Sequence, residues 1–238
     1  MSTTKLVAKE TVAEGTMLFR FEKPEGFAHI AGQTVDLTLV DPKETDAEGN
    51  MRTFSIVASP QEDTFAIATR MRDTAFKRNL RDMALGTELY LAGPFGSFTL
   101  HENTKRAAVF LSGGIGITPF HSIIKDATEK HLPHKLVLFY SNRRPEDAAF
   151  LTELQSLAKQ NTNFTLVATM TEMEKSAQTW DGERGYITAD MIKKYVHDDM
   201  MPIYYLAGPP AMVAAMLKML TDSGVSKDDI KFEEFAGY

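Results

Sequence analysis

The stretch LSGGIGITPF (residues 111–120) places three glycines, a threonine and a proline directly behind the apolar run RAAVFL. Glycine has no Cβ, so it permits unusual backbone dihedrals and lets another group approach the main chain closely. A tight turn needs only one such residue, and this stretch has three. We therefore predict a strand that turns into a helix here, with free N–H groups at the helix start that suit a pyrophosphate.

From Arg106 onward, apolar runs alternate with helical patterns. The runs are AAVFL, KLVLFY, FTLVATM and PIYYLAG. One helical pattern is RPEDAAFLTELQSLAKQ, with Pro145 near its start and with Phe150, Leu154 and Leu157 on one face. Another is PPAMVAAMLKMLTDSG. Repeated β–α units predict a parallel, doubly wound sheet, which binds ligands at the carboxyl ends of its strands.

The chain before residue 104 has a different pattern. TVDLTLV alternates polar and apolar residues, RTFSIVAS and FAIATRM are rich in strand formers, and TELYLAGPFGSFTL is broken by Gly-Pro and Gly. Short strands with turn signals at this frequency predict an antiparallel barrel or sandwich. The polar segment DPKETDAEGN (41–50) is predicted to be a mobile loop.

Composition and charge argue against several classes of function. A net charge of −6 disfavours nucleic acid or an anionic membrane as the main partner. No apolar stretch approaches the roughly 20 residues that span a bilayer, and MSTTKLVAKE lacks the apolar core of a signal peptide, so we expect a cytoplasmic protein. The chain has no cysteine to form a disulfide or to ligate an iron–sulfur cluster. Its six histidines lack metal-ligand spacing, so no metal site is expected.

Four motifs follow one another along the chain: RTFS at 52–55, GPFGSF at 93–98, GGIGITP at 113–119 and AGPPAM at 207–212. Their order resembles the ferredoxin–NADP(+) reductase superfamily, in which a flavin-binding β-barrel precedes a nicotinamide-dinucleotide domain. The resemblance covers nearly the whole chain. It implies an antiparallel β-barrel that binds FAD over residues 1–104, and an α/β domain with a parallel sheet that binds NADPH or NADH over residues 105–238.

The resemblance places the flavin first on RTFS. Arg52 would hold the flavin pyrophosphate through its planar fork. Phe54, which stands where the family has Tyr, would lie against the flavin, although an aromatic residue on a strand is also an ordinary core residue. Ser55 would hydrogen-bond near flavin N5 and is the candidate catalytic residue.

The segment ATRMRDTAFKRNL (68–80) resembles the stretch that continues along the flavin. Its length favours FAD over FMN, and its basic residues indicate either a phosphate site or a solvated helix face. The resemblance implies that Thr69 and Met71 contact the flavin through their backbones. It also implies that a helix begins with its N-terminus facing the phosphates, over Thr74, Ala75, Phe76 and Lys77.

In the second half, the resemblance implies that the dinucleotide pyrophosphate and the nicotinamide lie against the glycine turn, on Gly113, Gly114, Gly116, Thr118 and Pro119. The end of the next strand would read the adenosine ribose through Ser141, Asn142, Arg143 and Arg144. Because no acid precedes Glu146 there, the pattern leans towards NADPH. Arg144 has an alternative role as an ion-pair partner of Glu146 or Asp147.

The AGPPAM motif matches the family's last strand and turn at Gly208, Pro209 and Met212. It has Ala207 where many members have the Cys that lies beside the reacting nicotinamide carbon. The chain ends in EEFAGY, which resembles members whose terminal tyrosine covers the flavin. Tyr238 is therefore a candidate stacking residue, and Phe235 is its rival.

These features predict a FAD-dependent NAD(P)H oxidoreductase that passes hydride to FAD and electrons onward to a separate protein. That acceptor would be a ferredoxin, a flavodoxin or an oxygenase component. Two alternatives remain open: a reductase of free flavin or ferric chelates, and an electron-transfer subunit of a larger complex. The sequence names no acceptor, because acceptor surfaces have no local signature.

Overall fold

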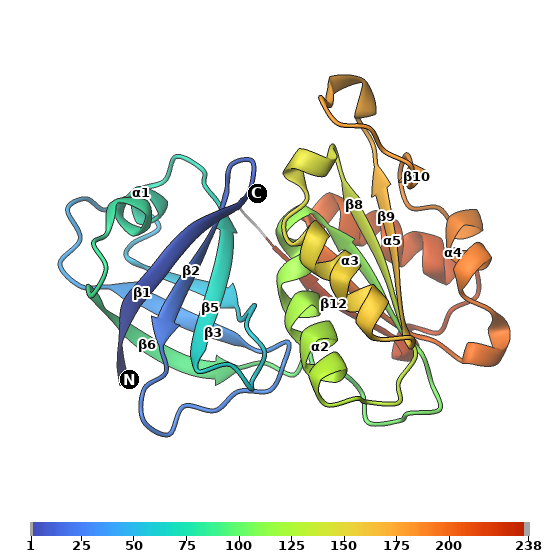
Figure 1. The fold of residues 1–238 in the computed structure, drawn as a ribbon, viewed down its shortest axis with the longest axis horizontal. Coiled ribbons are helices and arrows are strands. Elements are labelled where there is room, and N and C mark those ends of the chain that lie inside the picture. Colours follow the sequence, from blue (N-terminus) through green and yellow to red (C-terminus); the bar gives the residue numbers. More distant parts are fainter. Residues whose placement is uncertain (1, 236–238) are drawn as a thin grey trace.

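The computed structural model describes residues 2–235, which form two six-stranded sheets side by side (Figure 1). The first sheet is antiparallel with strand order β4-β3-β6-β1-β2-β5, and the second is parallel with order β10-β9-β8-β7-β11-β12. This arrangement confirms the predicted fold class, a β-barrel followed by an α/β sheet. The exact boundary between residues 104 and 105 stays a prediction.

The first sheet closes into a barrel. Ile56 bridges Ile67, and the Val57 N–H donates to the Ala66 carbonyl at 2.8 Å, which joins the two outer strands. Alternate side chains point inward, as β3 shows with its buried Val35 and Leu37. The elements of this half are β1 (Ser2–Ala13), β2 (Thr16–Glu22), β3 (Thr34–Leu39), β4 (Met51–Ser55), β5 (Thr64–Arg70), α1 (Ala75–Asp82) and β6 (Glu88–Phe95).

The second half packs helices on both faces of its sheet. Side chains of α2 and α3 join the apolar core on the face towards the barrel, whereas α4 and α5 cover the opposite face (Figure 1). All four predicted apolar runs form strands, and these strands are buried as a parallel sheet requires. The elements are β7 (Ala108–Gly113), α2 (Ile117–Glu129), β8 (Leu136–Asn142), α3 (Leu151–Gln160), β9 (Phe164–Met170), β10 (Glu183–Arg184), α4 (Ala189–Tyr195), β11 (Ile203–Gly208), α5 (Pro210–Asp222) and β12 (Ile230–Glu234).

The helical pattern over residues 144–160 forms a helix later than predicted. A short 3₁₀ turn occupies Pro145–Asp147, and α3 begins only at Leu151. Phe150 has the left-handed dihedrals φ 61° and ψ 12°, so it is not part of the helix, and its buried ring packs against His121 of α2 at a centroid distance of 4.5 Å. This tertiary contact overrides the local helical pattern.

The glycine turn joins β7 to α2 through a 3₁₀ turn, η1 (Gly114–Gly116). A Cβ at Gly116 would lie 2.2 Å from the Ala207 carbonyl oxygen, so this glycine lets the turn press against the backbone of β11. Gly114 has a φ of 54° and nothing within 4 Å of its Cβ position, so it supplies the left-handed dihedral and faces open space. The predicted strand–turn–helix is confirmed, and its glycines serve different purposes.

Within residues 2–235, none of the helices combines the length and the apolar character needed to cross a bilayer.

We predict that alanine substitutions at Gly116 and at Gly113, the two ends of this turn, destabilise the protein by different amounts. Gly116→Ala should lower the free energy of unfolding by about 3 kcal/mol or more, because its Cβ would meet fixed backbone. Gly113→Ala is the matched comparison, since its Cβ would meet the movable sulfur of Met212, and it should cost only about 1 kcal/mol. Denaturant unfolding of both variants tests this, and equal losses would contradict it.

Candidate functional site

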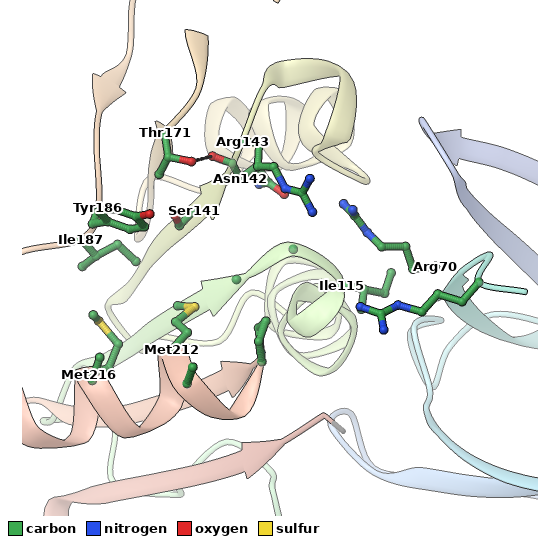
Figure 2. Close-up of a pocket in the computed structure, with 16 residues that line it drawn as sticks. Arg70, Ile115, Ser141, Asn142, Arg143, Thr171, Tyr186, Ile187, Met212 and Met216 are labelled. Carbon is green, nitrogen blue, oxygen red and sulfur yellow. Dashed lines mark hydrogen bonds between the residues drawn. The ribbon is translucent and has the colours of Figure 1, made fainter. Parts of the chain in front are cut away.

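A cavity of about 460 Å³ opens where β7, β8 and β11 end and lead into helices (Figure 2). This is the edge at which doubly wound sheets bind ligands. Residues of both the barrel and the α/β half form the wall of this cavity. The lining residues are Arg70, Arg72, Gly113, Gly114, Ile115, Ser141, Asn142, Arg143, Thr171, Tyr186, Ile187, Pro209, Ala211, Met212, Ala215 and Met216.

Three arginines give this cavity a strong positive charge. Arg70 and Arg72 come from the end of β5, and Arg143 follows β8. Figure 2 shows Arg70 and Arg143 extending from the two halves towards the same space. Among residues 2–235, none of the three forms a salt bridge. Asp147 and Glu172 interact electrostatically with Arg143 from nearby, but guanidinium groups that form no ion pair favour an anionic ligand.

Arg144 does not join them, although its sequence position groups it with Arg143. Its guanidinium makes two hydrogen bonds to Asp147, at 2.9 and 3.0 Å, and a third to Glu14 of the β1–β2 hairpin at 2.8 Å. Arg144 therefore forms the ion pair with Asp147 that was the alternative to binding the coenzyme. Arg144 thus attaches the α/β half to the barrel and does not line the cavity.

A second positively charged site lies at the start of α1. Thr74 caps this helix by accepting from the Lys77 N–H, and the Ala75 N–H donates to a carboxylate oxygen of Asp46 at 3.0 Å. Arg52 lies beside the same carboxylates, 2.8 Å from Glu48 and 3.4 Å from Asp46. Arg52 and the N-terminus of α1, which are predicted to hold a phosphate, are thus paired in this structure with carboxylates of the protein's own loop, Asp46 and Glu48.

The lowered pKa of Lys77 shows that positive charges are crowded at this site. Burial, followed by the charges of Arg72 and Arg52, lowers the pKa of Lys77 to about 8. A bound polyanion would relieve the repulsion among these side chains. Segment 41–50 forms no helix or strand, as predicted, and it is tied to α1 by the Glu44–Arg78 ion pair at 2.6 Å.

The other barrel residues predicted from the flavin motif surround this site. Phe76 is buried in the core and lies beneath the Arg52 guanidinium at 5.2 Å, whereas Phe54 is only partly buried, 5.8 Å from the Phe76 ring. Thr69 is buried on β5. The N–H of Met71 donates to the Gly15 carbonyl at 2.8 Å, and the predicted backbone contact of Met71 with the flavin stays a prediction.

A row of side chains on the barrel-facing side of the second sheet contains polar atoms without partners. The parallel register places Ser112, Ala207 and Glu233 next to one another on β7, β11 and β12. The Ser112 Oγ and the Glu233 Oε2 are buried without a hydrogen bond among the described residues, and so is the Oγ of Ser55 at the end of β4. Burial raises the pKa of Glu233 to about 7.

Sequence reasoning missed two of these functional candidates. Glu233 lies in the EEF stretch near the end of the chain, and two adjacent acids do not indicate in the sequence which of them is buried. Tyr186 follows β10 and lines the cavity with 78% of its surface exposed, so its ring is open to stacking. Its only signal is an aromatic residue next to the glycine of ERGY.

The structure separates the predicted dinucleotide residues into two groups. Gly113, Gly114, Ser141, Asn142, Arg143, Pro209 and Met212 line the cavity. Outside it, Gly116 packs on β11, Pro119 is buried in α2, the Thr118 hydroxyl donates to the Ile115 carbonyl, and the Gly208 carbonyl accepts from the Phe235 N–H. Phe235 packs against the apolar core that the barrel shares. Tyr238 lies outside the described residues.

Residues 2–235 contain no group of three or more His, Cys, Asp or Glu side chains arranged to hold a metal ion.

Comparison with known proteins finds matches to the α/β half and to most of the chain. Residues 110–218 match the family model of the oxidoreductase NAD-binding domain. The propane 2-monooxygenase reductase component of Rhodococcus jostii is 30% identical over 90% of this chain and 57% of its own length. A subunit of the Na(+)-translocating NADH-quinone reductase of Klebsiella pneumoniae is 33% identical over 64% of this chain and 38% of its own. The chain thus spans little more than half of the first relative and less than half of the second.

A solved structure extends the likeness to the whole fold. A ferredoxin NADP+ reductase from Neisseria gonorrhoeae, crystallised with bound FAD and NADP, superposes with a TM-score of 0.80 at 21% identity. The match covers 98% of both chains.

The unusual state of Glu233 predicts a pH-dependent stability. An ordinary glutamate releases its proton near pH 4.5, whereas the folded protein holds the Glu233 proton up to about pH 7. Between these values the folded state binds more protons, so this residue makes stability fall as pH rises. Glu233→Gln should therefore stabilise the protein at pH 8 and lose that advantage towards pH 4. Thermal unfolding at both pH values measures the difference.

Glu234→Gln, the exposed neighbour on β12, is the control for that comparison. It should show little difference from wild type at either pH. An advantage of Glu233→Gln that is equal at pH 4 and pH 8 would contradict the burial of an ionisable proton at this position.

Proposed function

We propose that the chain is a member of the ferredoxin–NADP(+) reductase superfamily and acts as a FAD-dependent NAD(P)H oxidoreductase. It takes hydride from the nicotinamide coenzyme and passes electrons to a separate protein. The observation that carries this proposal is the cavity at the junction of the two halves, where Arg70, Arg72 and Arg143 form no ion pair among the described residues and are open to an anionic ligand. Such a cavity suits a dinucleotide whose reacting end lies towards the barrel.

The residues of the barrel fit a flavin nucleotide. Arg52, Lys77 and the N-terminus of α1 form an anion site that already accommodates the carboxylate of Asp46. We assign the FAD pyrophosphate to this site, with Thr74 as the helix cap. Phe54, partly buried beside it, offers an apolar face. When bound, FAD supplies the conversion of a two-electron hydride donor into a source of single electrons.

The unpartnered polar atoms at the junction support a reacting centre. We assign Ser55 to the flavin edge at the end of β4, where its buried hydroxyl has no partner among the described residues. Ser112 and Glu233 flank Ala207 on the sheet face towards the barrel. With a pKa near 7, the Glu233 carboxyl holds or releases a proton in the physiological range. Phe235, next along the chain after β12, is the candidate aromatic cover of the flavin.

The outer part of the cavity suits the adenosine end of the coenzyme. Tyr186 offers an exposed ring for stacking, and the Asn142 amide is buried in the wall with Ser141 beside it. Arg143 is placed to hold a 2′-phosphate, which makes NADPH the preferred coenzyme and NADH the weaker one. The glycine turn at Gly113 and Gly114 leaves room for the pyrophosphate between these two ends.

We propose that the acceptor is a ferredoxin, a flavodoxin or an oxygenase component. The relative from Rhodococcus jostii is a reductase component and the one from Klebsiella pneumoniae belongs to a complex of several chains, which supports a separate protein partner. The second relative also favours an alternative, an electron-transfer subunit of a larger complex. Reduction of free flavin is less well supported, because the anion site at α1 favours flavin that stays bound.

Anaerobic stopped-flow spectroscopy tests this proposal. Protein loaded with FAD is mixed with NADPH or NADH, and the loss of flavin absorbance is followed. Reduced protein is then mixed with ferredoxin, flavodoxin, ferric chelate or free FMN. We expect fast reduction by NADPH and preferential oxidation by one of the proteins. Failure to bind FAD, or to be reduced by either coenzyme, would overturn the assignment.

The occupied anion site predicts opposite effects of two substitutions on flavin binding. Arg52→Ala should weaken FAD binding about a hundredfold, because two charge-assisted hydrogen bonds of about 1.5–3 kcal/mol each are lost. Asp46→Asn should strengthen it about tenfold, because the competing carboxylate loses its charge. Titration of flavin-free protein with FAD, followed by fluorescence, measures both. Arg81→Ala is the control, since Arg81 pairs with its neighbour Asp82. Equal affinities of the Arg52 and Arg81 variants would refute the site.

Arg143 and Arg144 are adjacent but have different surroundings, so substituting each of them tests which one distinguishes NADPH from NADH. Arg143→Ala should raise the KM for NADPH about tenfold, corresponding to about 1.5 kcal/mol for one lost phosphate contact, and leave the KM for NADH unchanged. Arg144→Ala should leave both KM values near wild type, because Arg144 is engaged with Asp147 and Glu14. Steady-state kinetics with both coenzymes decide the matter. If the Arg144 variant alone lost NADPH, the assignment would be reversed.

A further inference from the structure

Helix α2 is hydrogen-bonded to the segment that directly follows β4, the barrel strand that carries the flavin motif. The His121 Nδ1 lies 3.0 Å from the Val57 carbonyl oxygen, and the Ser122 hydroxyl donates to the Ala58 carbonyl at 2.7 Å. Both side chains are buried, at 3% and 0% exposure. A carbonyl can only accept, so Nδ1 carries the proton of this hydrogen bond. Two consecutive helix residues thus hold two consecutive carbonyls of the barrel.

These bonds lie close in sequence to both parts of the proposed site. Val57 is two residues beyond Ser55, and His121 lies one turn into the helix that follows Gly114–Gly116. The stretch between Ser55 and Val57 is held within the barrel by the Ile56–Ile67 bridge. A displacement of α2 relative to Val57 would therefore displace the glycine turn relative to Ser55.

The His121 ring is itself fixed from the other side. Its Nε2 lies 3.0 Å from a carboxylate oxygen of Glu153 on α3, a contact that is attractive when both ring nitrogens are protonated, because a carboxylate can only accept. The face of the ring packs against Phe150. The contact with His121 lowers the pKa of Glu153 to about 2, so this residue stays a carboxylate. One side chain thereby connects α2, α3 and the barrel.

We propose that His121, assisted by Ser122, is a positioning residue that sets the separation between the flavin strand and the dinucleotide turn. This inference rests on the proposed function. His121 touches neither cofactor site, and it acts through the Val57 carbonyl. The halves are also joined elsewhere, by the Glu14 N–H bond to the Glu146 carbonyl at 2.8 Å and by the ion pairs Arg144–Glu14 and Lys125–Glu62, at 2.8 and 3.0 Å. The bond of His121 differs from these because it holds the segment directly after Ser55.

Two isosteric substitutions separate the contacts of His121. In His121→Asn, the amide nitrogen occupies the place of Nδ1 and keeps a donor for Val57. In His121→Gln, the amide nitrogen reaches the place of Nε2 and keeps only the contact with Glu153. Thr128→Val is the structural control: it removes the hydrogen bonds that Thr128 makes within the α/β half, to Ile124 and Asn161, and does not affect the barrel.

The kinetic measurement is the rate of flavin reduction by a saturating coenzyme in FAD-loaded protein. His121→Gln should slow it about 10- to 100-fold, since misplacement by 1 Å can cost about a hundredfold in rate. The FAD affinity should not change, because the FAD site proposed above lies within the barrel. His121→Asn should restore a rate near wild type. Thr128→Val should lower the unfolding temperature and leave the rate unchanged.

A measurement without cofactor tests the same attachment. The chain has no cysteine, so Glu88→Cys on β6 and Lys159→Cys on α3, both exposed, accept spin labels at two defined places. The distance distribution between the labels should be narrow in wild type and in His121→Asn, and broad in His121→Gln.

The outcomes distinguish the two proposals. If wild type is reduced by coenzyme but His121→Gln reacts at the same rate with the same label distances, the positioning role is wrong. If wild type is not reduced by either coenzyme, the proposed function fails, and the label distances of the flavin-free protein still decide whether His121 fixes the halves.

Discussion

The close approach of Gly116 to the Ala207 carbonyl is the constraint on which the site depends. It presses the turn after β7 against β11, the strand that lies next to it in the sheet. Gly114 is thereby turned outward, where its left-handed backbone faces the cavity. A side chain at position 116 would displace the turn, the start of α2 and the contacts that this helix makes with the barrel. The turn therefore determines both the shape of the cavity and the attachment of the two halves.

Charge is distributed unevenly in this acidic protein, and the distribution explains how it can bind phosphates. One positive site, around Arg52 and the start of α1, is neutralised by Asp46 and Glu48. The other, made up of Arg70, Arg72 and Arg143, forms no ion pair among the described residues and lies open in the cavity. An entering flavin phosphate must displace carboxylates, whereas an entering coenzyme meets arginines that form no ion pair among the described residues. A phosphate group thus competes with carboxylates at the Arg52 site, whereas no carboxylate is ion-paired with the cavity arginines among the described residues.

The junction of the halves combines rigid packing with polar atoms that lack partners. Ala207 stands where the family resemblance places a cysteine, and it contributes no polar group of its own. The polar groups are supplied by its neighbours in the sheet, the Ser112 hydroxyl and the Glu233 carboxyl. Burying a carboxyl without a partner disfavours its charged form, which is why the pKa of Glu233 lies near neutrality. Proton chemistry at this junction would therefore rest on Glu233, which the sequence motif does not include.

The sequence alone determined the features that depend on local pattern. Alternation in TVDLTLV, the four apolar runs and the glycine turn predicted the antiparallel and parallel sheets correctly, because side-chain periodicity reflects which face is buried. The order of the motifs likewise predicted a barrel followed by an α/β half, which the structure contains. Only the tertiary structure decided the features that depend on partners distant in the chain. Phe150 leaves its helix to pack on His121, Arg144 pairs with Glu14 across the interface while its neighbour Arg143 enters the cavity, and Asp46 occupies the site of Arg52. Adjacent residues with the same side chain carry the same sequence signal, so only the three-dimensional arrangement of opposite charges and buried surfaces could distinguish their roles.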